Sequence, residues 1–174
     1  MKSDQSTRTA KQQIYQSLEL QSIELFRFEA NNSELVSKLW DAETLPKEPK
    51  ERYQLKQYVC QMLNLFEMAY RFRVSGIMDP AIFGSWVIWI WELSNAPAFS
   101  ALWSDKQEGL PLNYVPEFRE AVDIAICVAE QPGNIDPKSR RRMFFKKLAD
   151  LLSCSVVESW LEPQGCKQMS RLRS

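Results

Sequence analysis

Apolar residues recur every three or four positions along most of the chain, the spacing that places side chains on one face of an α-helix. No segment shows the strict alternation of a half-buried strand, and the sequence holds only five glycines. We therefore predict an all-α fold, a single-domain helical bundle of about six or seven helices. The helices are expected at about 8–30, through Trp40, at 50–75, at 80–95, around Phe99–Trp103, after Pro116 and from Asp136 to about Leu161.

The polarity of the two ends divides the chain. Residues 1–13 carry no apolar run, so we expect a flexible N-terminus without a signal peptide or membrane anchor. Residues 14–162 are expected to form the helical domain, whose last part, 136–162, is a basic C-terminal helical region. Residues 163–174 are expected to form a flexible tail. A chain of 174 residues is long enough for one good core and too short to favour two.

Local signals mark where two helices begin and where a third ends. Asp79-Pro80 and Asp136-Pro137 each place an N-cap residue before a proline, which is well tolerated at the first helical position. Gly76 suits the left-handed position after a helix C-terminus. The sequence therefore predicts a tight turn between the helices at 50–75 and 80–95.

The stretch FGSWVIWIWEL at 83–93 holds three tryptophans within six residues. It is too short for a transmembrane helix, which needs about 20 apolar residues. On a helical wheel the three tryptophans do not share one face, so this helix is apolar nearly all round. Such a helix is either central in its own domain or covered on its spare face by another chain. Ile88 and Trp91, which flank a narrow polar strip of Ser85 and Glu92, are the predicted partner-binding residues.

A polar stripe remains between the two apolar stripes of the long helix at 50–75. Asn64, Glu67 and Arg71 follow one another at helical spacing. Buried polar groups are normally paired, so one hypothesis is a buried polar network that fixes helix packing. The other is a site for an enzyme or ligand carrier, which requires a polar-lined cavity around the three side chains.

The segment KSRRRMFFKK at 138–147 carries six basic residues and no acidic one. The whole chain is balanced, with 22 basic and 22 acidic residues, so any attraction for an anion must be local. Basic residues near a helix N-terminus oppose the helix dipole, so helix stabilisation does not explain them. The segment is either a solvated basic face or a surface for an acidic protein, a nucleic acid or an anionic membrane. The residues for such an anionic partner would be Arg140, Arg141, Arg142, Lys146 and Lys147.

Composition argues against several kinds of chemistry. The chain has no histidine, the commonest general base and a frequent metal ligand. Its four cysteines are widely spaced and form no Cys-x-x-Cys pair, which favours a reduced, cytoplasmic location. Glu117, Glu120 and Asp123 lie near a predicted helix start, where the helix dipole accounts for them better than a metal does. We therefore expect no enzymatic activity, no metal and no cofactor.

Four segments of the chain follow one another in a characteristic order. They read QIYQSLELQSIELFRFEANNSELVSKLW, YVCQMLNLFEMAYRFRVSGIMDPAIFGSWVIWIWEL, APAFSALW and PEFREAVD, spanning roughly residues 14–125. Together they resemble an uncharacterised bacterial all-helical family, a domain of unknown function. Members of that family often follow an N-terminal transmembrane helix, a feature this sequence departs from. Asn64 and Glu67 match the family's Asn-x-x-Glu positions, to which the resemblance assigns no chemistry.

These observations favour a non-catalytic protein–protein interaction or regulatory module, in which a protein partner or self-association is expected. One alternative is a polybasic adaptor that binds a nucleic acid or an anionic membrane surface through 138–147. The other alternative is a small enzyme or ligand carrier built around Asn64, Glu67 and Arg71.

Overall fold

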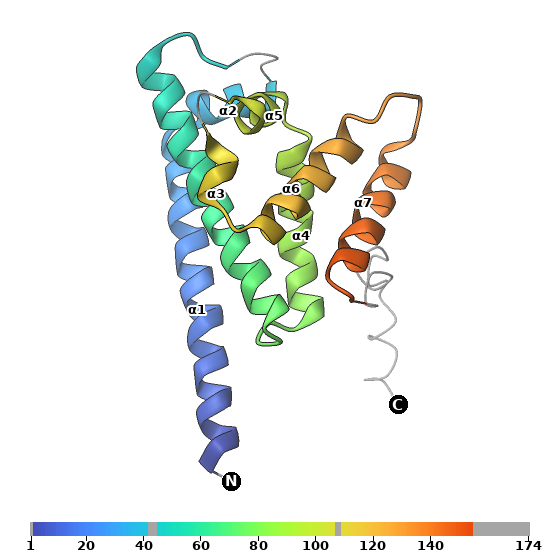
Figure 1. The fold of residues 1–174 in the computed structure, drawn as a ribbon. Helices are drawn as coiled ribbons and strands as arrows, with labels where there is room; N and C mark the ends of the chain where they lie inside the picture. The colour runs from blue at the N-terminus through green and yellow to red at the C-terminus, as the bar shows by residue number, and fades with distance from the viewer. Residues whose placement is uncertain (1, 42–44, 107–108, 155–174) are drawn as a thin grey trace, which may run out of the picture.

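The computed structural model describes residues 2–41, 45–106 and 109–154. Across these ranges the regular elements are seven α-helices and a short 3₁₀ helix, without a strand (Figure 1). The prediction of an all-α, single-domain bundle of six or seven helices is confirmed. The elements are α1 (Lys2–Asn31), α2 (Ser33–Asp41), α3 (Pro49–Val74), α4 (Pro80–Ser94), α5 (Pro97–Ser104), η1 (Leu110–Asn113), α6 (Pro116–Ala129) and α7 (Pro137–Leu151).

The first helix is longer than the pattern predicts, because α1 begins at Lys2 instead of near residue 8. The hydrophobic period that predicted the helix is missing from this polar N-terminal part, so the pattern could not mark where the helix begins. Figure 1 shows this part of α1 extending past the turn that joins α3 and α4. Most of the segment 1–13 is thus helical in the structure, and its flexibility stays a prediction.

Helices α3 and α4 form the centre of the core. The side chains of α3 are buried on the two stripes that its pattern predicts, and Phe66 is fully buried. Helix α4 packs against α3 on one side and α6 on another, and Phe83 and Val87 are fully buried there. One continuous apolar cluster joins residues from all seven α-helices. The tryptophan helix is therefore central in its own domain.

The predicted helix starts are present with their hydrogen bonds. The Asp79 side chain accepts from the backbone N–H of Ala81 at 2.8 Å, and the Asp136 side chain accepts from that of Ser139 at 3.0 Å. Gly76, with a φ of 73°, takes the left-handed conformation expected after α3. These local features form the tight turn from which α4 runs back alongside α3 (Figure 1).

Helices α6 and α7 form an antiparallel pair that covers α4 (Figure 1). Helix α7 ends at Leu151, about ten residues before the end predicted near Leu161. The chain turns there because Ser153 adopts a left-handed φ of 49° and the backbone N–H of Cys154 donates to the carbonyl of Ala149. The rest of the predicted basic helical region and the tail at 163–174 lie outside the described residues.

Candidate functional site

The face of α4 that we predicted to meet a partner is covered by the chain itself. Trp91 is 8% exposed, and its ring stacks on Phe144 of α7 with centroids 5.4 Å apart. Ile88 is half-buried and packs against the same apolar cluster. The spare face at Trp91 is thus filled by α7, a long-range contact that the periodicity of α4 alone does not reveal.

A different apolar surface is exposed where α1 passes α4. Phe26 of α1 is 48% exposed, and its ring packs edge-on against Trp89 of α4 at 5.1 Å. Ile23, one helical turn before Phe26, is 40% exposed, and Ile82, two turns before Trp89, is 42% exposed. We call these four residues the α1–α4 apolar surface.

The geometry of α1 and α4 accounts for this surface. The Tyr15 hydroxyl donates to the carbonyl of Ile77 at 3.3 Å and accepts from the backbone N–H of Asp79 at 3.0 Å. Tyr15 thus contacts the start of α4, and Phe26, further along α1, contacts Trp89, further along α4, so the two helices run in the same direction. Sequence reasoning missed the surface because it followed the buried face of the first helix. Apolar residues that lie off that face were the available signal.

The prediction of a buried polar network in α3 is wrong for two of its three residues. Asn64 and Arg71 are exposed, because the stripe between the two apolar stripes of α3 faces outward instead of toward a neighbouring helix. Asn64 lines an open groove between α1 and α3 together with Leu20 and Gln61. Within the described residues Glu67 and Arg71 form no ion pair.

The carboxylate of Glu67 holds the start of α6 instead. Its Oε1 accepts from the backbone N–H of Val115 at 2.9 Å, immediately before Pro116 opens that helix. A carboxylate at a helix N-terminus satisfies an unpaired donor and interacts favourably with the helix dipole. Among the described residues, Glu67 contacts the loop before α6, whereas Asn64 lines the groove between α1 and α3. The enzyme or carrier hypothesis stays a prediction.

The neighbouring Tyr114 is buried, and burial raises its pKa above the ordinary value. The nearby Cys60 and Glu67 raise this pKa further.

An acidic residue of α6 that we considered as a metal ligand has a structural partner. Asp123 accepts a hydrogen bond from the Trp103 indole N–H at 2.7 Å. Among the described residues, no three His, Cys, Asp or Glu side chains gather in a way that would hold a metal ion.

The basic segment divides into one structural arginine and several exposed cations. The Arg140 guanidinium donates to the backbone carbonyls of Ala129 at 3.0 Å, Gln131 at 2.9 Å and Gly133 at 3.0 Å. Arg140 therefore closes the turn between α6 and α7 and is not free for an anionic partner, a correction to its predicted role. Its donors find these carbonyls because the chain reverses direction just before α7 begins.

The other basic side chains of α7 face outward. Lys138, Arg142, Lys146 and Lys147 are exposed, and Arg141 is half-buried. The aromatic and leucine residues between them turn the other way, since Phe144, Phe145 and Leu148 are fully buried. Within the described residues, none of the salt bridges involves α7.

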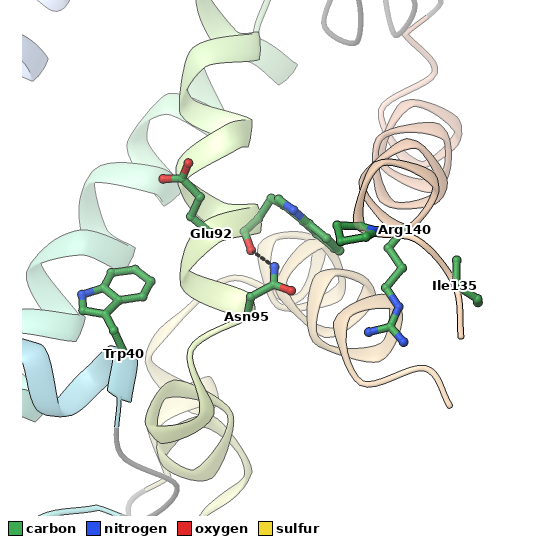
Figure 2. Close-up of a pocket in the computed structure, with 7 residues that line it drawn as sticks. Trp40, Glu92, Asn95, Ile135 and Arg140 are labelled. Atoms are coloured by element: carbon green, nitrogen blue, oxygen red, sulfur yellow. Dashed lines mark hydrogen bonds between the residues drawn. The ribbon is translucent and has the colours of Figure 1, made fainter. Parts of the chain in front are cut away.

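An open groove of about 710 Å³ lies between α2, α4 and the start of α7 (Figure 2). We call it the Trp40–Arg140 groove; its lining residues are Trp40, Trp91, Glu92, Asn95, Ile135, Pro137 and Arg140. The amide nitrogen of Asn95 donates to the carbonyl of Trp91 at 2.6 Å, which fixes the side chain at the floor of the groove. In Figure 2, Trp40 and Glu92 lie on one side of α4 and Arg140 lies on the other.

Sequence reasoning did not single out Trp40 as a site residue. Its ring is 37% exposed at the end of α2, just before the loop that leads to α3. The available signal was its position at the end of a short predicted helix, just before the polar and proline-containing stretch LPKEP.

A comparison of the chain with protein-family models, curated proteins and solved structures finds no match. The resemblance to an uncharacterised helical family stays a prediction. None of the helices in the described part of the chain combines the length and the apolar character that crossing a membrane requires.

Proposed function

We propose that the protein is a non-catalytic protein–protein interaction module that meets its partner through the α1–α4 apolar surface. The observation that carries the proposal is the exposure of Ile23, Phe26 and Ile82 around the half-buried ring of Trp89. A cluster of exposed apolar side chains with aromatic members is typical of protein interfaces. Aromatic residues near the centre of such a cluster commonly contribute most of the binding free energy.

This proposal relocates the partner surface predicted from the tryptophan helix. Trp91 stacks on Phe144 within the same chain, so its substitution damages the core before it affects any partner. Ile88 is half-buried and remains a candidate for the edge of the interface. Helix α4 contributes to both the core and the proposed surface because it is apolar nearly all round.

The proposal is tested first by light scattering at several protein concentrations. If the partner is a second copy, the wild-type mass rises above that of a monomer, and Ile82→Glu abolishes the rise because it buries a charge in the interface. Leu112→Glu is the control, since Leu112 is also apolar and is more exposed than Ile82 but lies on η1. All three proteins should show the same helical circular dichroism.

If the wild type is a monomer, the partner is a different protein. A photo-crosslinking amino acid at position 26 should then capture one partner in cells that make the protein, and Ile82→Glu should prevent the capture. The same crosslinker at position 112 should not capture this partner. Equal capture from both positions, or a monomer with no capture from position 26, would contradict the proposed surface.

The exposed cations of α7 favour a second candidate function, a polybasic adaptor for a nucleic acid. Four basic side chains share the outer side of this helix without an acidic partner in the described chain. The fully buried Phe144 and Phe145 leave little apolar surface on α7 for insertion into a lipid bilayer, which makes a nucleic acid the better fit.

Oligonucleotide binding at increasing salt tests this second candidate. The triple variant Arg142→Ser, Lys146→Ser and Lys147→Ser should bind more weakly, and each lost phosphate contact should reduce the salt slope by about 1. Lys50→Ser is the control, because Lys50 is an exposed cation at the start of α3. Arg140 is left intact, since it holds a turn. Binding that ignores salt, or that falls equally in the control, rules this candidate out.

A further inference from the structure

The Trp40–Arg140 groove contains a carboxylate without a partner in the described chain. Glu92 is exposed, and its carboxylate makes no hydrogen bond or ion pair within the described residues. The cation in the lining, Arg140, keeps its charge while it donates to three backbone carbonyls, but it lies on the other side of α4 from Glu92 (Figure 2). The Glu92 side of the groove is therefore locally negative, and the Arg140 side is positive.

The aromatic wall lies on the same side as this charge. Trp40, 37% exposed, and Glu92 both line the groove, one from the end of α2 and the other from α4 (Figure 2). The face of a tryptophan ring attracts cations more strongly than that of any other side chain, and a nearby carboxylate adds direct charge attraction. This pair of groups selects positive charge over negative charge.

The rest of the lining suits an apolar body attached to the cation. Ile135, Pro137 and Trp91 contribute apolar side chains to the lining. The Asn95 amide nitrogen is used on the Trp91 carbonyl, which leaves its oxygen as an acceptor for an N–H donor. Three of the five Arg140 N–H donors are used on backbone carbonyls, and Nε is buried, so this guanidinium has little capacity left to bind an anion.

We propose that the Trp40–Arg140 groove binds an organic cation, an ammonium or guanidinium group carried on an apolar body. The cation lies between the Trp40 ring and the Glu92 carboxylate, and the apolar body lies toward Ile135 and Pro137. A groove of about 710 Å³ is within the size range of sites for small organic ligands. This site is separate from the α1–α4 apolar surface, so either proposal can fail without the other.

Ligand-observed saturation-transfer NMR with benzyltrimethylammonium chloride tests the proposal. The wild type should bind this probe saturably with a Kd on the order of 1 mM, as expected for one cation–π contact and one exposed ion pair. Glu92→Gln should weaken binding roughly three- to five-fold. Trp40→Leu should abolish saturable binding, whereas Trp40→Phe, which keeps an aromatic face, should retain part of it.

Three controls separate a cation site from an unspecific groove. Benzyl alcohol keeps the aromatic body without the charge and should bind at least about five-fold more weakly. Glu120→Gln removes an exposed carboxylate of α6 that does not line the groove, and it should leave binding unchanged. Circular dichroism should show that every variant is folded.

The source of the cation is identified by a second probe, a blocked Gly-Arg-Gly peptide. Stronger binding of benzyltrimethylammonium supports a small organic ammonium compound as the ligand, and stronger binding of the peptide supports the side chain of another protein. The proposal is overturned if neither cation binds saturably below about 50 mM, if benzyl alcohol binds as well as the cation, or if Glu92→Gln binds like the wild type.

Discussion

At the scale of single residues, Arg140 illustrates how position decides the role of a charge. Its guanidinium is half-buried and donates to three backbone carbonyls around the end of α6, where no intrahelical donor is available. Arg142, two residues later, faces solvent and forms no salt bridge within the described residues. The sequence around the two arginines is the same basic segment, so it does not distinguish them. They differ in role because Arg140 points toward the turn between α6 and α7, whereas Arg142 points into solvent.

This difference predicts unequal effects on stability. Arg140→Ala should lower the free energy of unfolding by about 2 kcal/mol, because it leaves carbonyls at the α6 C-terminus unpaired. Arg142→Ala should change it by less than about 0.5 kcal/mol, as is usual for an exposed substitution. Urea unfolding followed by circular dichroism measures both values. Equal stability of the two variants would mean that the Arg140 hydrogen bonds contribute nothing.

At the scale of helices, what the sequence predicted depends on the range of the interactions involved. The caps at Asp79 and Asp136 involve neighbours two or three residues away, so the Asp-Pro pairs in the sequence were enough to predict both helix starts. The stacking of Trp91 on Phe144 joins residues from two distant helices, which no periodic pattern specifies. The period of α4 indicated a helix apolar on nearly every side but could not assign α7 to one side and α1 to another.

The same limit explains the errors in α3. The pattern correctly marked two buried stripes, yet a residue between them is buried only if a third helix covers that side. No helix covers Asn64 or Arg71, and both are exposed. Glu67 gained its role from the loop before α6, whose path depends on the whole fold. Site prediction thus failed where tertiary arrangement decides exposure.

The contact between α1 and α3 predicts how stability depends on pH. Tyr58 of α3 is buried against α1, where its hydroxyl donates to Glu29 at 3.3 Å and its ring stacks on Phe28 at 5.5 Å. Burial, and then the charge of Glu29, raise the Tyr58 pKa above its ordinary value of about 10. The folded state therefore favours the neutral phenol, which ionises more readily in the unfolded chain.

The sign of the effect follows from this raised pKa. The contribution of Tyr58 is fully present below pH 10 and is lost as the pH rises above 10 toward the folded-state pKa. Urea unfolding between pH 7 and pH 11 should show a decline only at the alkaline end, and Tyr58→Phe should make that decline shallower. The exposed Tyr53 provides the control Tyr53→Phe, which should follow the wild type. If Tyr58→Phe has the wild-type pH dependence, the buried phenol does not account for the decline.

At the scale of the whole molecule, the apolar cluster links every α-helix, but α1 joins it over only part of its length. Ile14, Tyr15, Leu18 and Leu25 bring α1 into the core, and Leu18 is 1% exposed. Before these residues, the side chains at positions 8–10 are all exposed, and α1 extends past the α3–α4 turn (Figure 1). We therefore expect α1 to unfold together with the rest of the bundle from about Ile14 onward, and we expect its first turns to contribute little to the stability of the bundle.

Removal of residues 1–10 tests this division of α1. The truncated protein should unfold in one transition, coincident by far-UV circular dichroism and tryptophan fluorescence, with a free energy of unfolding within about 0.5 kcal/mol of the full chain. Leu18→Ala should instead cost about 2–4 kcal/mol, because it leaves a cavity at the contact between α1 and the core. If truncation costs as much as Leu18→Ala, the first turns of α1 support the bundle through contacts of their own. If the two optical probes no longer coincide, α1 unfolds as a separate unit, and the α1–α4 apolar surface would then belong to a segment able to detach from the core.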